Sequence, residues 1–342
     1  MSVRMPAEWE PHTRTWMEFP PLNETFAPDP ERYRAAWTNV ANTVAQYEPV
    51  TVVADPGDVG AAAALLLPDV EVLAQPIDDA WMRDSGPTFT LTDGRLTAVH
   101  WTFNAWGNAG FSGFAREQHV GAWVARRAGV ATDDVTRSRL VNEGGGIHVD
   151  GDGTVLLTDT VQLDPGRNPN WSRAEVEAEI HARLGTTTAI WLPRGLTRDY
   201  EYFGTRGHVD IVACFVAPGV VVAHSQGNPA HPDHAVTTDL VALLRNSTDS
   251  AGRRLEVIEL PAPTVLTDDD GWVDYSYVNH YVCNGAVVLC AFDDPHDEVA
   301  AELLAECYPD REVVLVPARD LFDRGGGIHC ITQQQPVAAA GG

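Results

Sequence analysis

The sequence contains no lysine, so all 23 of its basic side chains are arginines. Without a lysine amine, the chain cannot form a Schiff base with pyridoxal phosphate, complete a phosphate-binding P-loop or act as a Ser/Lys hydrolase. Basic residues are also outnumbered, because 48 aspartates and glutamates give a net charge of −25. This charge disfavours nucleic acid and anionic membranes as partners and attracts a cationic ligand. Solubility alone is an equally good explanation of the acidity.

Cysteine and long apolar runs are scarce as well. The five cysteines, which are Cys214, Cys283, Cys290, Cys307 and Cys330, form an odd set without a Cys-x-x-Cys pair. This argues against a disulfide framework or a structural zinc site, so we expect free thiols. The N-terminus lacks the apolar core of a signal peptide, and the longest apolar run, Val59 to Leu67, is too short to span a bilayer. We therefore expect a cytoplasmic protein.

Alternating helix and strand signals fill the first part of the chain. A helix is predicted with Asp29 as its N-cap and Pro30 at its first position, because apolar residues from Tyr33 to Tyr47 recur on one face. The elements predicted next are a strand over Val50 to Ala54, a helix over Val59 to Leu67 and a strand over Val70 to Ala74.

The rest of the chain repeats one pattern at intervals of roughly 60 residues, in which a hairpin is followed by a helix and a single strand. The predicted hairpins are Thr88 to Trp101, Ile147 to Thr158, His208 to Ser225 and Tyr277 to Phe292. The predicted helices are Phe114 to Ala128, Ser172 to Leu184, Asp233 to Arg245 and Asp297 to Cys307. The predicted single strands are Ser138 to Val141, Thr188 to Leu192, Arg254 to Leu260 and Glu312 to Val316.

A fifth hairpin forms only if the C-terminal segment Ile331 to Gln335 pairs with the N-terminal segment Thr15 to Phe19. That pairing would make the chain a ring. The predicted fold is therefore α/β, with residues 1–342 forming one catalytic domain of five ββαβ-type repeats.

Each repeat places a loop rich in glycine and charge between its single strand and the next hairpin. The loops are Asp78 to Gly86, Asn142 to Gly146, Thr197 to Gly207, Asp268 to Asn279 and Arg319 to Cys330. In a ring these loops meet at one rim. Singly, their chemical residues have ordinary explanations, since a lone cysteine is often a buried apolar residue and loop aspartates often make turns. Together they suggest a site.

The candidate residues on this rim are Asp84, Glu143, His208, Asp210 and Cys330. We expect His208 and Asp210 to point to the same side, because they lie two apart at the start of a predicted strand. Gly325 to Gly327 precede Cys330 and allow its backbone to pass close to a ligand. Trp16, Trp81 and Trp106 are candidates for the mouth of the site, where aromatic faces suit a cation, although such residues are more often core.

Several motifs resemble the agmatine deiminase family, which belongs with the bacterial peptidylarginine-deiminase-type enzymes in the pentein superfamily. They are Met5-Pro6-Ala7-Glu8-Trp9-Glu10-Pro11-His12, Trp81-Met82-Arg83-Asp84-Ser85-Gly86-Pro87, Glu143-Gly144-Gly145, Gly207-His208-Val209-Asp210 and Gly326-Gly327-Ile328-His329-Cys330-Ile331-Thr332-Gln333-Gln334. The match runs end to end and in order. It implies a pentein five-bladed α/β propeller with pseudo-fivefold repeats, no cofactor, no metal and a homodimer.

The resemblance also implies roles for the rim residues. Cys330 matches the nucleophile, His208 the general acid and base, Glu143 an acid that orients the histidine or contacts substrate, and Asp84 and Asp210 the pair that grips the guanidinium. The chemistry favours these types, because two carboxylates bind the N–H edges of a guanidinium and hold its carbon beside the sulfur. The implied reaction converts agmatine and water to N-carbamoylputrescine and ammonia through a covalent intermediate, as in polyamine biosynthesis.

Carboxylates around Cys330 should raise the pKa of its thiol, so few empty sites would carry a thiolate. We hypothesise that the bound cation itself helps to ionise Cys330.

The substrate tail is left open, because family members usually carry an acid and then Thr-Asn or Thr-Asp before Gly-His. This chain instead reads Gly204-Thr205-Arg206 before Gly207 and His208. Asp199, Glu201 or an aspartate of Asp268 to Asp270 would then supply the negative charge for the ammonium of agmatine. Arg206 is interpreted as exposed or paired with Glu201; if it faces the site, a guanidino acid becomes the expected substrate.

Two other classes of function remain open at this point. An amidinotransferase uses the same cysteine chemistry but passes the amidine to an amine. A ligand-binding or metal-binding protein would use His148, His208, His329 and Cys330 without turnover. We expect His329 and Cys330 to point to opposite faces of a strand, which disfavours their binding one ion.

Overall fold

Five sheets with a shared plan form the body of the computed structural model, which describes residues 2–108, 113–201 and 203–339. In each sheet an antiparallel hairpin is extended by a third strand parallel to its second strand. The strand orders are β1-β5-β6-β7, β8-β9-β10, β11-β12-β13, β16-β17-β18 and β19-β2-β3-β4, and β14 and β15 form a small separate hairpin. Residue 202 of the predicted third rim loop lies outside the described residues.

The strands are β1 (Val3–Arg4), β2 (His12–Glu18), β3 (Val50–Ala54), β4 (Glu71–Ala74), β5 (Thr88–Thr92), β6 (Arg95–Thr102), β7 (Val135–Val141), β8 (His148–Val149), β9 (Thr154–Thr158), β10 (Thr188–Leu192), β11 (Ala213–Ala217), β12 (Val220–Ser225), β13 (Glu256–Pro261), β14 (Thr267–Asp268), β15 (Gly271–Trp272), β16 (Tyr281–Cys283), β17 (Ala286–Ala291), β18 (Glu312–Pro317) and β19 (Gln333–Pro336). The α-helices are α1 (Pro30–Val44), α2 (Val59–Leu65), α3 (Met82–Ser85), α4 (Ala105–Asn108), α5 (Glu117–Arg127), α6 (Asp159–Gln162), α7 (Arg173–Leu184), α8 (Asp233–Asn246), α9 (His296–Cys307) and α10 (Arg319–Phe322). The 3₁₀ turns of the described residues are η1 (Thr132–Asp134), η2 (Gly144–Gly146), η3 (Arg198–Tyr200), η4 (Val209–Ile211) and η5 (His329–Ile331).

Local signals account for many of these boundaries. Helix α1 begins after Asp29, whose side chain accepts a hydrogen bond from the backbone amide of Arg32. Helix α7 has the predicted capping box, in which Ser172 and Glu175 satisfy each other's backbone amides. The β5–β6 hairpin turns where Asp93 and Gly94 both adopt positive φ, as a two-residue hairpin turn requires. The four predicted internal hairpins are confirmed, with shorter strands in two of them.

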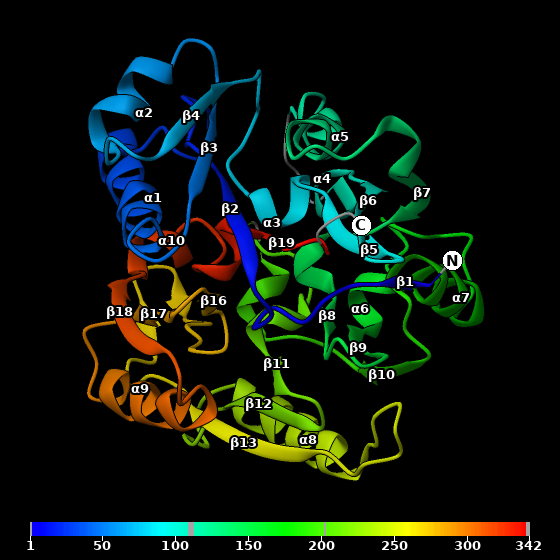
Figure 1. The fold of residues 1–342 in the computed structure, drawn as a ribbon. Helices are drawn as coiled ribbons and strands as arrows, with labels where there is room; N and C mark the ends of the chain where they lie inside the picture. Colours follow the sequence, from blue (N-terminus) through cyan, green and yellow to red (C-terminus); the bar gives the residue numbers. More distant parts are fainter. Residues whose placement is uncertain (1, 109–112, 202, 340–342) are drawn as a thin grey trace.

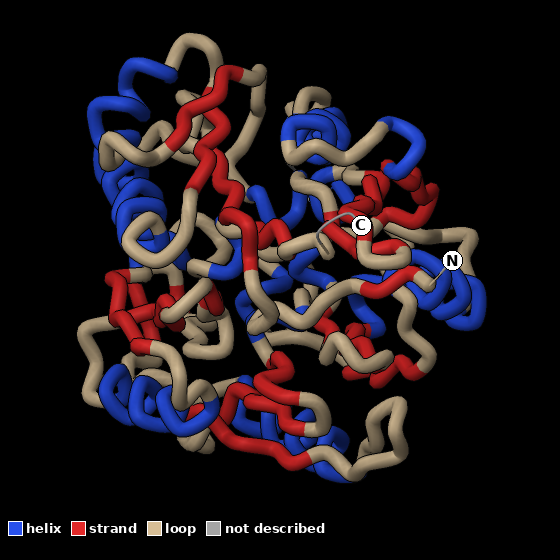
Figure 2. The backbone as a smooth tube through the Cα atoms, in the orientation of Figure 1, coloured by secondary structure: helices blue, strands red, loops and turns tan. Residues whose placement is uncertain are grey.

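The predicted pairing of the two chain ends is also confirmed. Strand β19 runs antiparallel to β2, with Gln333 opposite Trp16 and Gln334 opposite Thr15. The elements are arranged around a common centre (Figure 1), and the longer helices lie at the periphery (Figure 2). The contact between the ends is therefore one strand pair within one sheet, and no sheet formed by the described residues closes on itself.

Two sequence expectations about strand starts are wrong. Residues 209–211 and 329–331 form the 3₁₀ turns η4 and η5, and strands begin only after them, at Ala213 and Gln333. A 3₁₀ turn has three residues per turn, so the alternation of a strand does not set the directions of His208 and Asp210, or of His329 and Cys330. Gly207 and Gly325, which precede these turns, have φ of +116° and +106° and turn the chain out of an extended path.

Trp16 is a core residue rather than part of a mouth. Its side chain is 1% exposed and packs in one hydrophobic cluster with residues that include Val53, Met82 and Phe89. Its indole Nε1 donates a hydrogen bond to Gln335 on the paired strand β19. Trp16 therefore stabilises the junction of the chain ends. No helix of the described residues is both long and apolar enough to cross a membrane.

Candidate active site

The thiol of Cys330 lies buried where several rim loops meet. Its side chain is 2% exposed, and Sγ lies 3.3 Å from Nδ2 of Asn279 and 3.7 Å from Oδ2 of Asp210. A methyl group on Gly326 would lie 2.9 Å from Sγ and 2.8 Å from the ring of Trp81. Only glycine therefore allows the indole of Trp81 and the thiol to approach this backbone so closely.

His208 is held at one ring nitrogen and unpaired at the other. Its Nε2 lies 3.2 Å from Oε2 of Glu143, and both carboxylate oxygens of Glu143 accept from Nε of Arg167. Its Nδ1 has no hydrogen-bond partner among the described residues, although Oδ2 of Asp84 lies 3.8 Å away. Glu143 thus orients the imidazole, and Nδ1 is the nitrogen free to exchange a proton with a ligand.

Asp84 lies at the short helix α3 and is oriented by two donors. The backbone amide of Gly145 donates to its Oδ1 at 3.1 Å, and the indole Nε1 of Trp106 donates to its Oδ2 at 2.8 Å. Trp106 was expected either at the mouth of the site or in the core. It is 5% exposed, contacts Asp84 and lines a neighbouring pocket.

The buried charges of the site shift one another's pKa values. Burial raises the pKa of Asp84 to about 6, against the opposing effect of His208. Burial alone would lower the pKa of His208, but Asp84, Glu143 and Asp210 outweigh it and raise this pKa to about 9. Burial would raise the pKa of Glu143, but the charges of Arg167 and His208 hold it below its usual value. At neutral pH the site therefore contains an imidazolium surrounded by carboxylates.

The thiol itself is held in its neutral form in the empty site. Burial, together with the charges of Asp210 and Asp84, raises the pKa of Cys330 well above its ordinary value. This matches the direction expected from the sequence, and a thiolate requires an additional positive charge nearby.

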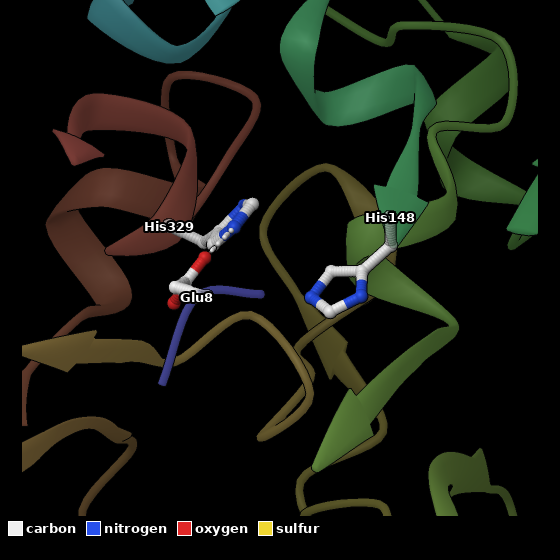
Figure 3. A group of neighbouring side chains, drawn as sticks. All are labelled: Glu8, His148 and His329. Atoms are coloured by element: carbon white, nitrogen blue, oxygen red, sulfur yellow. Dashed lines mark hydrogen bonds and ion pairs between the residues drawn. The ribbon is translucent and has the colours of Figure 1, made fainter. Parts of the chain in front are cut away.

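Glu8, His148 and His329, the residue before the nucleophile candidate Cys330, form a buried cluster (Figure 3). Their potential ligand atoms lie within 4.8 Å of one another, which is close enough to suggest a metal site. However, the backbone amide of Phe215 donates to Nδ1 of His148, which leaves the proton of the neutral ring on Nε2. Both nitrogens of His329 face carboxylates. The protonation of both rings therefore opposes metal binding.

Arg206 forms an ion pair that the sequence did not suggest. Its Nη1 lies 3.0 Å from both carboxylate oxygens of Asp164, which also binds Arg167. The expected pairing with Glu201 is therefore wrong, because Asp164, which follows α6 in the same repeat, folds against this loop. The Arg206 side chain is nevertheless 42% exposed, as the other expectation had it. Asp199 is also used structurally, since its carboxylate accepts from the backbone amides of Thr205 and Gly207. Both of its oxygens are turned toward the backbone of its own loop.

Two pockets share Phe203 in their lining, and one of them borders the segment that leads to Cys330. One, of about 240 Å³, is lined by Trp106, Phe103 and acids that include Asp79. The other, of about 330 Å³, is lined by Gly325 and by Glu201, Asp270 and Asp274. Arg198 and Asp323 also line this second pocket, so four acids face one arginine there, and that excess of carboxyl groups favours a cation. Burial raises the pKa of Asp274 to about 7, which weakens its own contribution at neutral pH.

Sequence reasoning missed Asn279, whose amide contacts the thiol, and the Glu8–His329 pair. Asn279 ends the fourth rim loop, just as His208 follows the third, so its place in the repeat was the available signal. The aspartates earlier in that loop drew attention instead. Nothing in the local sequence indicates that Glu8 reaches His329, which lies 321 residues away.

Replacing Gly145 by alanine is expected to lower kcat/KM for a guanidino substrate by about 100-fold, because small displacements of catalytic groups have effects on that scale. The new methyl would lie 2.4 Å from Nδ1 of His208 and 3.1 Å from Oδ2 of Asp210. Steady-state kinetics would measure the change. Gly60→Ala is the matched control, since nothing lies within 4 Å of that position in α2 and alanine favours a helix. Equal kinetics for the two variants would contradict the packing described here.

A family model described as Porphyromonas-type peptidyl-arginine deiminase matches residues 4–336. A Streptomyces coelicolor protein that carries the provisional name agmatine deiminase is 60% identical over 341 residues, covering 98% of this chain and 99% of that protein. The agmatine deiminase of Pseudomonas aeruginosa strain LESB58 is 40% identical over 363 residues, covering 98% of this chain and 95% of that protein.

Among solved structures, one of the agmatine deiminase of Enterococcus faecalis superposes with a TM-score of 0.93 at 32% identity. The superposition covers 99% of this chain and 97% of that one. The similarity therefore extends over both the fold and nearly the whole sequence.

Proposed function

The chain belongs to the agmatine deiminase family, and from this premise we propose that it hydrolyses agmatine to N-carbamoylputrescine and ammonia through a covalent adduct on Cys330. One observation carries the assignment of residues. Two buried atoms without a hydrogen-bond partner among the described residues, Nδ1 of His208 and Oδ1 of Asp210, lie beside the thiol's loop. Oδ1 of Asp210 can accept a hydrogen bond from an N–H group of a guanidinium. Nδ1 of a protonated His208 can donate one to the leaving nitrogen.

In the proposed complex, Asp84 and Asp210 accept the N–H groups of the guanidinium. Charge-assisted bonds of this kind contribute roughly 1.5–3 kcal/mol each and fix the guanidinium carbon beside Sγ. Without substrate, the charges of Asp210 and Asp84 help to raise the pKa of the Cys330 thiol. The incoming cation binds these two carboxylates and offsets their effect, so it favours loss of the Cys330 proton.

The proposed reaction then has two halves. Sγ of Cys330 attacks the guanidinium carbon, and His208 gives a proton to the departing nitrogen as the carbon–nitrogen bond breaks and ammonia leaves. A thiouronium-type adduct remains. Water, which gives a proton to the now neutral His208, adds to the same carbon, and the carbon–sulfur bond breaks to release the ureido product. Glu143 holds His208 in place during both transfers.

We assign the distal ammonium of agmatine to the pocket of about 330 Å³ beside Gly325. The acids that line this pocket outnumber its one arginine, Arg198, so it supplies the negative charge that the Gly204-Thr205-Arg206 sequence lacks; they are Glu201, Asp270, Asp274 and Asp323. A carboxylate tail would meet these acids and be repelled. Because Arg206 is paired with Asp164, it does not offset that repulsion.

We expect ammonia release from agmatine to exceed that from arginine or 4-guanidinobutyrate by about 100-fold or more in kcat/KM, because like charges brought together at a binding site cost several kcal/mol. A coupled assay of ammonia with the three substrates measures this directly. Preference for either acid would overturn the agmatine assignment. Turnover that requires ornithine or glycine as the amidine acceptor, and that releases the substrate's own amine instead of ammonia, would identify an amidinotransferase.

The same proposal covers the architecture and setting of the enzyme. We interpret the five sheets as the blades of a pentein propeller, which makes residues 1–342 one catalytic domain of five ββαβ-type repeats. The net charge of −25 supports a small cationic substrate and disfavours nucleic acid or anionic membrane as a partner. We further propose that the enzyme is cytoplasmic, forms a homodimer and uses neither a cofactor nor a metal.

A further inference from the structure

The carboxylate of Asp210 depends on His329 for its orientation. Nδ1 of His329 lies 2.7 Å from Oδ2 of Asp210. Among the described residues, the other hydrogen bond to this carboxylate comes from the weakly donating thiol of Cys330 at 3.7 Å. Oδ1 is buried and has no hydrogen-bond partner among those residues. His329 therefore fixes one oxygen of Asp210, and the other is available to an N–H donor.

Glu8 fixes His329 in turn. Its Oε2 lies 2.8 Å from Nε2 of His329, and its Oε1 accepts a hydrogen bond from the backbone amide of Val282 at the same distance. Figure 3 shows the carboxylate of Glu8 meeting the ring of His329. Since Val282 belongs to strand β16, the orientation of the carboxylate of Glu8 is set by the sheet itself.

Arg83 locks the same network to the loop that carries Asp84. Its Nε donates to the backbone oxygen of His329 at 3.2 Å, and its Nη2 lies 3.6 Å from Oε2 of Glu8. Arg83 precedes Asp84 in α3, so a movement of His329 would also displace the carboxylate of Asp84. The N-terminal segment, α3, η4 and η5 thus meet in one buried set of charges.

We propose that His329 and Glu8 are positioning residues for guanidinium recognition: Glu8 fixes the His329 ring, and the ring holds Asp210 with one oxygen free for the substrate. The inference rests on the proposed deiminase function and extends it to residues that do not touch the reacting atoms. The residue before the nucleophile thus acts through Asp210, and the N-terminal segment becomes part of the substrate-binding apparatus.

The first experiment compares His329→Ala with His329→Asn. Alanine removes the donor to Asp210, so KM for agmatine should rise about 10-fold or more while kcat falls less, because the contact serves both ground and transition state. Asparagine places an amide nitrogen near the former Nδ1 and should recover much of that loss. His280→Ala is the matched control, since His280 is buried nearby and bonds the backbone oxygen of Tyr277. Its KM should remain close to that of the wild type.

The second experiment compares two isosteric changes in the N-terminal segment. Glu8→Gln removes the charge beside His329 and should raise KM several-fold relative to Glu10→Gln, whose carboxylate pairs with Arg4 instead. Thermal melting of all variants separates loss of folding from loss of binding.

An unchanged KM in His329→Ala, failure of asparagine to improve on alanine, or equal KM values for Glu8→Gln and Glu10→Gln would each overturn the inference. Failure of the wild type to release ammonia from agmatine would instead refute the proposed function on which it rests.

Discussion

Cys330→Ala is expected to lower kcat for agmatine by at least about 10⁴-fold, the scale on which loss of a covalent nucleophile acts. The thiol is the atom that would form the bond to the guanidinium carbon, and neither the Asn279 amide nor the Asp210 carboxylate beside it can replace sulfur in that role. Ammonia release measures the rate. Binding of agmatine should persist, because Asp84 and Asp210 remain, and calorimetry would detect it.

The matched control is Cys307→Ala, which removes a partly buried thiol of α9. No described contact of the site involves Cys307, so this variant should keep wild-type kinetics. Ammonia release by Cys330→Ala at the wild-type rate would rule out the nucleophile assignment. Equal losses in both cysteine variants would indicate a general effect on folding.

His208→Gln is expected to lower kcat by roughly 10³-fold, within the range of general acid and base catalysis. Nδ1 is the nitrogen free to transfer protons, and glutamine offers no titrating group in its place. The second half of the reaction should slow most, so intact-protein mass spectrometry after mixing with agmatine should detect an adduct on Cys330. His181→Gln is the control, because His181 lies on α7 and bonds Thr186. An adduct on another residue would contradict the mechanism.

The proposed roles of Asp84 and His208 also predict how kcat/KM of the wild type depends on pH. Asp84, with a pKa of about 6, must be ionised to bind a guanidinium, and His208, with a pKa of about 9, must be protonated to release ammonia. The rate should therefore rise through about pH 6 and fall through about pH 9, as macroscopic values of coupled groups. In His208→Gln the alkaline limb should disappear while the acid limb remains. An alkaline limb that survives the substitution would remove His208 from the proton transfers.

Structural features that are encoded by adjacent residues could be predicted from the sequence. The Asp93-Gly94 turn, the Asp29 N-cap and the Ser172–Glu175 capping box each depend on a few neighbouring dihedral angles and hydrogen bonds. The hairpin, helix and strand periodicities extend these signals over each repeat. That repetition also indicated which loops face one another, and hence that Asp84, Glu143, His208, Asp210 and Cys330 belong together.

The direction or partner of a side chain could not be predicted where distant segments of the chain determine it. Whether residues after Gly207 or Gly325 continue as strand or enter a 3₁₀ turn depends on packing against neighbouring loops, so the alternation expected of a strand does not apply there. Trp16, a candidate for the mouth or the core, packs into the core. Arg206, expected to be exposed or paired with Glu201, is partly exposed and pairs with Asp164. Long-range contacts of this kind leave no periodic pattern in the local sequence.

The sequence by itself therefore determined the order of elements, the two chain ends that pair, and the residue types that gather at the rim, because local propensity and repetition suffice for these. Only the tertiary structure decided how those residues face one another: Nδ1 of His208 unpaired, Asp210 held by His329, and the thiol against Asn279. The physical reason is that charges and hydrogen bonds act over a few ångströms in space, whatever the separation along the chain. Glu8 and His329 lie 2.8 Å apart only because the fold brings the two ends of the chain to one centre.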